Sequence, residues 1–286
     1  TEKVKTWEYS FLKNKNTEHI QSLFGDITGD GQKELIVVVY SFGIESELYI
    51  FQTDQNRPTK QAPEIYSIPK AGKGTKPLSA HLIKWDADKD EELLLNLSSP
   101  ERALLILDYA INKIIPITQV AQEFMTSTYG PIYTQVLAIN NDEKDDIVIF
   151  NNSQNPEIYQ LISNEENQQQ KVQTKAPIID SESILYNKQH EQLTVLSDGS
   201  IYLTNRQKKI KTDNIKCQDI IPLSPKRHLL LTEKGELLDV FLDLKNEQYI
   251  INNKHTLNTN ANNNKKEFSY VIGNNKNAGI FVNKNN

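Results

Sequence analysis

The feature that most constrains the fold of this chain is an acidic segment of ten residues that occurs three times in its first 147 residues. The three copies align without gaps, and each has Asp at the fifth position and an acidic residue at the ninth. They are Asp26–Leu35 (DITGDGQKEL), Lys84–Leu93 (KWDADKDEEL) and Ala138–Ile147 (AINNDEKDDI). The fifth-position aspartates lie 58 and then 54 residues apart. A nearly fixed spacing of this kind indicates a repeat protein, in which one supersecondary unit recurs and packs on its neighbours.

Each acidic segment lies between two segments that look like strands. The residues before the first copy, His19–Phe24, have a short mixed strand pattern, whereas the residues after it, Leu35–Tyr40, form a continuous apolar run. The other two copies have the same flanks, namely Ala80–Trp85 with Leu93–Leu97, and Thr134–Ile139 with Ile147–Phe150. Short apolar runs of this length are typical of strands buried on both faces. The repeat therefore predicts a strand, an acidic turn, a buried strand and then further strands.

The rest of the chain also has β patterns. Paired apolar runs surround Asp198-Gly199 in Leu193–Thr204 and Lys234-Gly235 in His228–Phe241, and Tyr270–Val282 is a third such pair. Such pairs are hairpin signals, and they recur at the spacing of four-stranded propeller blades. At the other end of the chain, Val4–Leu12 alternates like a strand. It is a candidate to close the ring by pairing with the last blade, because closure removes exposed sheet edges.

We therefore predict an all-β protein, a single β-propeller domain over residues 1–286 with roughly five to seven blades. Blades with acidic turns are expected over about 17–175 and hairpin-type blades over about 183–286. Helical periodicity is weak. Arg102–Ile111 fits a helix or a buried strand, and Pro156–Asn164 is a weaker helical candidate. The Asn-rich segment Asn252–Lys266 has little to bury and is expected to form a long loop.

Composition excludes several classes of protein. The 37 acidic residues outnumber the 32 basic ones, and such a chain is a poor general binder of nucleic acid. No apolar run approaches the length that spans a bilayer, so membrane insertion is not expected. The single cysteine, Cys217, excludes an internal disulfide framework and a multi-cysteine metal site. Residues 205–286 carry a net charge of +6 and residues 1–204 carry −11, so the acids of the first part are the place to look for a site.

The first acidic segment has oxygen-bearing groups at alternating positions, and alternating side chains of a tightly curved loop converge on one point. Gly29 and Gly31 allow the backbone angles that such a curve needs. Several hard oxygen ligands in one loop suit Ca²⁺. The helical calcium loop is a poor match, because Val37 stands where that loop needs Glu. The oxygens belong to Asp26, Thr28, Asp30, the backbone carbonyl of Gln32, and Glu34.

The stretch Phe24–Leu35 (FGDITGDGQKEL) resembles the FG-GAP/VCBS family of β-propeller repeats, which occurs in integrin α-subunit heads and many secreted bacterial proteins. The resemblance covers Phe24 to about Phe150, and the Gly-Ala-Pro element of that family is not evident. It implies a calcium loop between two strands of a blade, which the ion stabilises. The ligands it implies are Asp26, Thr28, Asp30, Gln32 through its carbonyl, and Glu34.

The second and third copies are weaker candidates for calcium, because Lys84 and Ala138 replace the first-position aspartate. The second copy offers Asp86, Asp88, Asp90 and Glu92, together with Glu91, and could bind in a shifted register. The third copy keeps Asn140, Asp142 and Asp146. The alternative for every copy is a turn that Asp and Asn side chains hold by hydrogen bonds without a metal.

No catalytic constellation is recognisable. The five histidines, at positions 19, 81, 190, 228 and 255, form no two-histidine metal spacing, and there is no Gly-x-Ser-x-Gly elbow. Cys217 follows a basic stretch but has no identifiable base, and Ala71–Lys76 lacks the glycine spacing of a phosphate loop. The basic run Arg206–Lys211 is read as a solvated hairpin face, with an acidic partner surface as the alternative. We expect a protein that is not an enzyme.

The sequence thus favours a non-catalytic, calcium-stabilised platform for binding another protein. The chain begins at Thr1 and has only Met125, so a leader was removed or the chain was shortened, and the favoured location is extracytoplasmic: periplasmic, secreted or at the cell surface. One alternative is a carbohydrate-binding or adhesion module, for which the candidate aromatics are Tyr129, Tyr133, Tyr40 and Trp85. Further alternatives are an enzyme of the polysaccharide-lyase type and an intracellular scaffold subunit with vestigial calcium loops.

Overall fold

The structure is a computed structural model. It describes Tyr9 and residues 17–41, 46–54, 57–68, 76–98, 102–109, 113–116, 132–140, 142–151, 156–162, 169–186, 189–212, 215–224, 226–256, 267–271 and 279–283. Within these ranges the secondary structure is β, apart from one short 3₁₀ turn, η1 (Thr204–Arg206). None of the described segments is a helix with the length and apolar character needed to cross a membrane. The all-β prediction is confirmed.

The chain folds into successive antiparallel sheets whose strands are adjacent in sequence order. The first sheet contains β1 (Thr17–Gly25), β2 (Glu34–Ser41), β3 (Glu47–Phe51) and β6 (Glu64–Ser67), and β4 (Thr53–Asp54) and β5 (Arg57–Pro58) pair beside it. The second contains β7 (Pro77–Ile83), β8 (Glu92–Leu97), β9 (Ala103–Asp108) and β10 (Lys113–Pro116). The third contains β11 (Ile132–Leu137), β12 (Asp146–Asn151), β13 (Glu157–Leu161) and β14 (Gln169–Gln173).

The later sheets continue the same pattern. The fourth contains β15 (Ile178–Tyr186), β16 (Gln189–Leu196), β17 (Ile201–Leu203) and β18 (Lys208–Ile210). The fifth contains β19 (Cys217–Ser224), β20 (Arg227–Thr232), β21 (Glu236–Asp243) and β22 (Gln248–Thr256). A two-stranded sheet of β23 (Glu267–Val271) and β24 (Gly279–Asn283) follows, where the sequence predicts its last hairpin.

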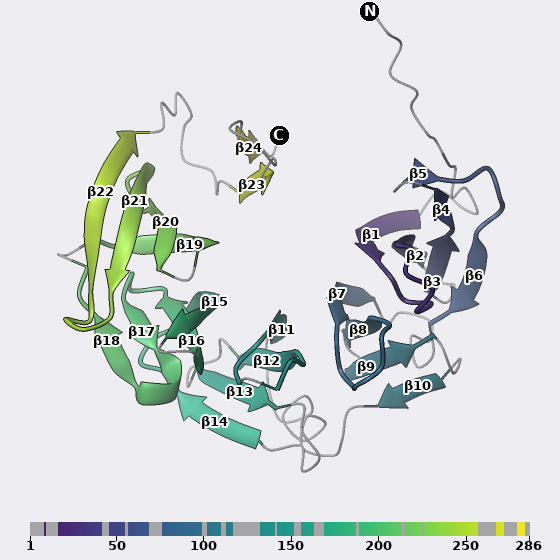
Figure 1. Cartoon of the computed structure of the whole chain (residues 1–286), viewed down its shortest axis with the longest axis horizontal. Coiled ribbons are helices and arrows are strands. Elements are labelled where there is room, and N and C mark those ends of the chain that lie inside the picture. The colour runs from purple at the N-terminus through teal and green to yellow at the C-terminus, as the bar shows by residue number, and fades with distance from the viewer. Residues whose placement is uncertain are drawn as a thin grey trace, which may run out of the picture.

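The sheets are arranged as propeller blades. Each of β1, β7, β11 and β15 contacts the first strand of the next sheet, which is β7, β11, β15 or β19. Figure 1 shows these first strands on the inner side of an arc, with β6, β10, β14, β18 and β22 on its outer side. The described residues form five four-stranded blades and a two-stranded sixth sheet, within the predicted range of five to seven.

The hydrophobic cores lie between the blades. Ile36 and Val38 of β2 pack with Leu93 and Leu95 of β8, whereas Leu94 of β8 faces the third blade. Similar clusters join the third blade to the fourth and the fourth to the fifth. Because alternate side chains of β2 and β8 pack in different core clusters, these strands are buried on both faces, which explains their continuous apolar runs.

Two local expectations are wrong. Pro156–Asn164 is not helical: Glu157–Leu161 forms β13, because Ile158 and Leu161 are fully buried between blades. The first part of the Asn-rich segment is not a loop either, since β22 continues to Thr256 in register with β21. Residues 257–266 lie outside the described part of the chain. Arg102–Ile111, which fitted either structure, contains strand β9.

The predicted closing strand, Val4–Leu12, lies outside the described residues except for Tyr9. The ring of Tyr9 contacts two aromatic side chains of β3. Its centroid lies 4.9 Å from that of Phe51 and 6.2 Å from that of Tyr49. Both partners are buried in a cluster on the face of the first blade that points away from the second blade.

Candidate metal centre

The three acidic turns occupy equivalent places in the first three blades. They connect β1 to β2, β7 to β8 and β11 to β12, and we name them the first turn (Asp26–Lys33), the second turn (Lys84–Glu91) and the third turn (Ala138–Asp145). Each follows the innermost strand of its blade, so all three lie on the same face of the propeller. The repeat seen in the sequence is thus a repeat of position in the fold.

The acid at the ninth position closes each turn from the first residue of the following strand. Its side chain is almost completely buried and accepts a hydrogen bond from the backbone N–H of the second position. The bonds are Ile27 N to Glu34 Oε2 at 3.2 Å, Trp85 N to Glu92 Oε2 at 2.9 Å, and Ile139 N to Asp146 Oδ2 at 2.7 Å. A role in holding the turn therefore explains the acid in all three copies.

The third and fifth positions also hold the backbone of the turns. In the second and third turns the third-position side chain accepts from the fifth-position N–H, through Asp86 at 2.9 Å and Asn140 at 3.1 Å. In the first and third turns the fifth-position aspartate accepts from the seventh-position N–H, through Asp30 at 2.7 Å and Asp142 at 3.0 Å. These are turns of the Asx type, and they form without an ion.

The sixth position distinguishes the second turn from the other two. Gly31 in the first turn has a φ of +85°, and Glu143 in the third turn keeps a φ of +66° although it is not glycine. Lys89, the equivalent residue of the second turn, is not among the residues with positive φ. The backbone of the second turn therefore has a different conformation at this position from that of the first and third turns.

The first turn does not bring its predicted carboxylates together. Asp26 Oδ2 accepts a hydrogen bond from Gly31 N at 2.8 Å, and Thr28 Oγ1 lies 3.5 Å from Glu34 Oε1. The carboxylates of Asp26, Asp30 and Glu34 do not form a group within ligand distance. The other oxygen of Asp26, Oδ1, is buried and has no hydrogen-bond partner among the described residues. An unpartnered buried oxygen at the first ligand position is compatible with a cation.

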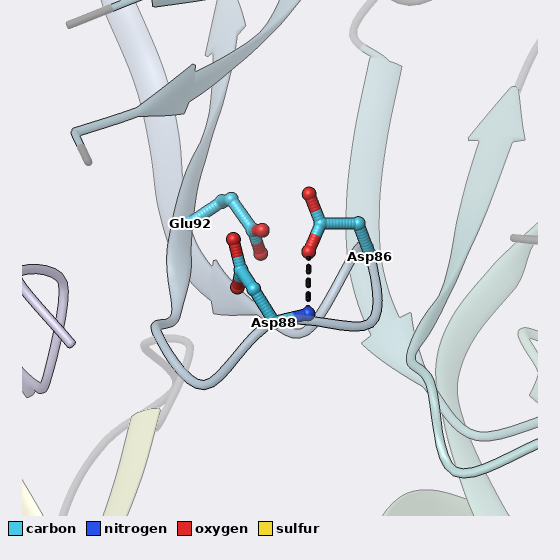
Figure 2. A group of neighbouring side chains, drawn as sticks. All are labelled: Asp86, Asp88 and Glu92. Atoms are coloured by element: carbon cyan, nitrogen blue, oxygen red, sulfur yellow. Dashed lines mark hydrogen bonds between the residues drawn. The ribbon is translucent and has the colours of Figure 1, made fainter. Parts of the chain in front are cut away.

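The second turn has the converging geometry. Asp86, Asp88 and Glu92 each place a carboxylate oxygen within 4.8 Å of the others, and they form the one such group of acids, histidines or cysteines among the described residues. Figure 2 shows the three carboxylates pointing toward a common space, with Asp88 N donating to Asp86. Lys84 at the first position is exposed and stands outside this group. Asp90, the fourth predicted ligand, is buried beside Gly29 of the first turn and lies outside this group.

These carboxyl groups lack a counter-charge in the described structure. Burial, together with the charges of Asp86 and Asp88, raises the pKa of Glu92 to about 7. Burial, the nearby Asp90 and the charge of Asp86 raise the pKa of Asp88 to about 6. In the first turn, burial and the charge of Asp30 raise the pKa of Glu34 to about 7. A bound cation would favour the ionised form of each group.

In the third turn, a side-chain amide donates a hydrogen bond to a carboxylate that a cation could otherwise bind. Asn140 Nδ2 donates to Asp142 Oδ2 at 2.8 Å, while Asp146 is committed to Ile139 N. Of the predicted weak site of this copy, Asn140 and Asp142 are therefore joined by a hydrogen bond, and Asp146 is bonded to the backbone of the same turn. This turn fits the metal-free alternative.

Consecutive turns are joined to each other through the eighth position, which sequence reasoning did not single out. Glu91 Oε2 accepts from Asp26 N at 3.0 Å, and Glu91 N donates to Asp26 O at 2.8 Å. The same pair of bonds joins the next two blades: Lys84 N donates to Asp145 Oδ2 and Asp145 N donates to Lys84 O, both at 2.9 Å. The signal was present in the sequence, since the eighth position is acidic in the second and third copies and Lys33 in the first.

Gly25 lets the first two turns approach each other. A Cβ atom on Gly25 would lie 2.5 Å from Leu82 Cδ1 and 2.7 Å from Glu91 Oε2. A side chain at this position would force the side chains of Leu82 and Glu91 in the second blade to move. The glycine of the Phe24-Gly25-Asp26 sequence therefore serves the contact between blades.

The other candidate residues do not form a catalytic site in the described part of the chain. Cys217 is buried, and burial raises the pKa of its thiol to about 12, which disfavours the reactive thiolate. None of the histidines joins a group of metal ligands. In the basic run, Arg206 pairs with Glu191 and Lys208 pairs with Glu247, so these two charges are already neutralised.

The aromatic residues proposed for carbohydrate binding do not gather on one exposed surface. Tyr40 is buried in β2, and Trp85 packs against the core between the second and third blades. Tyr133 is half exposed, and Tyr129 lies outside the described residues.

Comparison with known proteins establishes the fold alone. No family model matches the chain, and no curated protein matches it. Among solved structures, it is similar to the Dos1 propeller (TM-score 0.53, 14% identity, covering 79% of this chain and 58% of that one). It is similar to BBS1N in complex with ARL6DN (TM-score 0.52, 14% identity, covering 91% of this chain and 86% of that one). It is also similar to the WD40 domain of SCAP from fission yeast (TM-score 0.51, 15% identity, covering 95% of this chain and 61% of that one). The chain thus spans less than two thirds of the Dos1 and SCAP structures, and its fold is that of a β-propeller.

Proposed function

We propose that this protein is a non-catalytic β-propeller that serves as a platform for binding another protein, and that Ca²⁺ bound in its acidic turns stabilises the first blades. The observation that carries the calcium proposal is the group of Asp86, Asp88 and Glu92, whose oxygens lie within 4.8 Å of one another. Calcium coordinates hard oxygens and accepts carboxylates in flexible loops, so this donor set fits it.

The second turn is the better prepared site. Its three carboxylates already converge, whereas in the first turn Asp26 is turned toward Gly31 and would have to move. The unpartnered Asp26 Oδ1 supports a further ion in the first turn. Its ligands would be those that the family resemblance implies: Asp26, Thr28, Asp30, the Gln32 carbonyl and Glu34.

The fold supports the platform role. Propellers carry function in the loops of two broad faces, and no catalytic constellation is present among the described residues. One similar propeller, BBS1N, was solved in complex with another protein, ARL6DN. The turns of the first three blades form a joined row on one face, and we propose this row as part of the surface that a partner contacts.

The proposal favours a location outside the cytosol. A site with three carboxylates and no dedicated helical loop is expected to bind calcium weakly, and weak sites fill where calcium is millimolar. The alternative is an intracellular scaffold in which the turns are vestigial. The calcium affinity separates these two cases.

The test is thermal unfolding of the whole chain in millimolar Ca²⁺ and in chelator. An ion that binds only the folded state stabilises it by about 2.7 kcal/mol at a concentration one hundred times its Kd. We expect calcium to raise the Tm, Asp88→Asn to remove most of the rise, and Asp30→Asn to remove a smaller part. Asp54→Asn, an exposed acid of β4, is the matched control and should keep the full rise.

Two results would contradict the calcium proposal. The first is a Tm that does not depend on calcium at all. The second is a rise that survives both Asp88→Asn and Asp30→Asn, because the ion would then bind elsewhere. The platform role is tested separately, by capturing partners with the wild type and with a variant carrying lysines at exposed positions of the second and third turns.

A further inference from the structure

A cavity of about 230 Å³ lies between the third and fourth blades, away from the acidic turns. Its walls come from the end of β14 and the residues after it, from β16 and β17, and from η1. Val172 and Leu196, two members of the core between these blades, provide an apolar wall. The hydroxyl-bearing residues Thr194, Tyr202 and Thr204 provide a polar one.

A buried chain of hydrogen bonds leads to the polar wall of this cavity. Gln160 Nε2 donates to Gln192 Oε1 at 2.5 Å, and Gln192 Nε2 donates to Ser181 Oγ at 2.7 Å. Ser181 Oγ lies 3.2 Å from Thr194 Oγ1, which lies 2.6 Å from Thr204 Oγ1. All five side chains are almost completely buried. Burying polar side chains in an otherwise apolar contact between blades costs free energy, so packing alone does not explain this network.

In one of the two directions open to the bond between Thr194 and Thr204, a hydroxyl proton is left for the cavity. The Ser181 oxygen accepts from an amide that can only donate, so its own proton can go to Thr194 Oγ1 or to Leu193 O. When Thr194 donates to Thr204, the Thr204 hydroxyl has no acceptor among the described residues. Because Thr204 lines the cavity, its O–H is then available to an acceptor bound there.

The cavity also has an unpaired cation and no acid. The ammonium group of Lys175 and the hydroxyl of Tyr202 have no hydrogen bond or ion pair among the described residues, and both side chains line the cavity. None of the lining residues is Asp or Glu. The site therefore offers two hydroxyl donors and one positive charge beside an apolar wall.

We propose that this cavity binds a carboxylate attached to a short apolar group. The carboxylate would accept hydrogen bonds from Thr204 and Tyr202 and pair with Lys175, and the apolar group would lie against Val172 and Leu196. Such a carboxylate can belong to a small organic acid or to the C-terminus of a partner peptide. Hydrogen bonds to a charged acceptor are about twice as strong as neutral ones, which favours the acid over its amide.

The test compares charged and neutral probes by isothermal titration calorimetry on the whole chain. The probes are 4-methylpentanoate, 4-methylpentanamide, and a leucine-terminated tripeptide with a free or an amidated C-terminus. We expect a carboxylate probe to bind at least about tenfold more tightly than its amide, because a charge-assisted bond contributes about 1.5–3 kcal/mol. Binding of 4-methylpentanoate identifies a small acid as sufficient, whereas binding of the free tripeptide alone identifies a peptide terminus.

Variants connect the binding to the cavity. Lys175→Met, at an exposed position that should not disturb folding, is expected to weaken carboxylate binding about tenfold. Thr204→Val removes the buried donor and should weaken it similarly, and Lys60→Met on the first blade is the matched control with unchanged affinity. The proposal is overturned if no probe binds saturably at millimolar concentration, if acid and amide bind equally, or if Lys175→Met binds as well as Lys60→Met.

Discussion

Glu91 of the second blade and Asp26 of the first exchange two hydrogen bonds, one from Asp26 N to Glu91 Oε2 at 3.0 Å and one from Glu91 N to Asp26 O at 2.8 Å. The first of these bonds needs the carboxylate of Glu91, which therefore joins two blades and lies outside the group of Asp86, Asp88 and Glu92. The equivalent residue of the third blade, Asp145, makes the same contact with Lys84. Acids of similar appearance in one segment thus serve different purposes.

The first prediction concerns this contact. Glu91→Ala should lower the free energy of unfolding by about 1–3 kcal/mol, because the N–H of Asp26 loses a charged acceptor. Glu91→Gln keeps an acceptor and should cost less. Urea unfolding in chelator measures both, since the contact does not involve an ion. A loss no larger than that of the exposed control Asp54→Ala would contradict the role of Glu91.

Gly25→Ala is expected to destabilise the protein by about 1–3 kcal/mol, the usual cost of overpacking. The added Cβ would lie 2.5 Å from Leu82 Cδ1, so the Leu82 side chain must move from its place between the two blades. Leu82→Ala in the same chain should recover part of the loss, and a double-mutant cycle from urea unfolding measures the recovery. If the two losses simply add, the crowding explanation is wrong.

Glu143→Gly should stabilise the third turn. Glu143 has a φ of +66°, a conformation that costs a non-glycine residue about 1 kcal/mol or more. Glycine adopts it freely, as Gly31 does at the same position of the first turn. The neighbouring Lys144→Gly, where φ is not positive, should be destabilising. The midpoint of denaturant unfolding should therefore rise for the first variant and fall for the second.

His228 makes stability sensitive to acid. It is a fully buried residue of β20 whose ring lies against that of Tyr249 in β22, and burial lowers its pKa to about 4 from the ordinary 6.5. The unfolded chain takes up the proton first, so stability is lost as the pH falls from about 6.5 to about 4. The loss can reach about 3 kcal/mol. His228→Phe should flatten this part of the pH profile, whereas His19→Gln on the surface should leave it unchanged.

Glu182 makes the stability of the protein sensitive to rising pH, whereas His228 makes it sensitive to falling pH. Burial, together with the charges of Asp180 and Asp219, raises the pKa of Glu182 to about 8. Its folded-state pKa exceeds the ordinary 4.5, so its contribution to stability is complete below 4.5 and is lost as the pH rises through about 8. Glu182→Gln should therefore gain stability relative to the wild type at pH 8.5 but not at pH 4.5. Thermal unfolding at the two pH values measures this, and equal effects at both would contradict it.

The sequence allowed the order of elements in the first three blades to be predicted because each acidic turn is flanked by strands of recognisable period. It did not distinguish helix from strand in Glu157–Leu161, where the apolar spacing is ambiguous and burial between blades decides. The sequence favoured the first turn as the calcium site, and this stays a prediction. Consensus residues such as Gly29 and Gly31 mark that turn, whereas the convergence of Asp86, Asp88 and Glu92 occurs in a turn that lacks the positive φ of Gly31 and Glu143 at its sixth position.

The contacts between blades were invisible in the sequence for a different reason. Glu91 and Asp145 bind residues about sixty positions earlier, and a pattern within one repeat does not report its neighbour. The cavity network from Gln160 to Thr204 is likewise assembled from two blades. Local signals therefore located the turns, whereas the partners of their side chains follow only from the arrangement of the blades.

Each of the four large core clusters is shared by two neighbouring blades, and a smaller fifth cluster belongs to the first blade alone. The second, third and fourth blades thus each contribute to two shared cores. Deleting one of these blades would expose an apolar face on each side of the gap. The remaining blades could not pack together in its place, because their turns are matched to particular neighbours. For the same reason, amide exchange should lose protection across adjoining blades together. The contact between two neighbouring blades, and not the single sheet, is therefore the unit that holds this fold together.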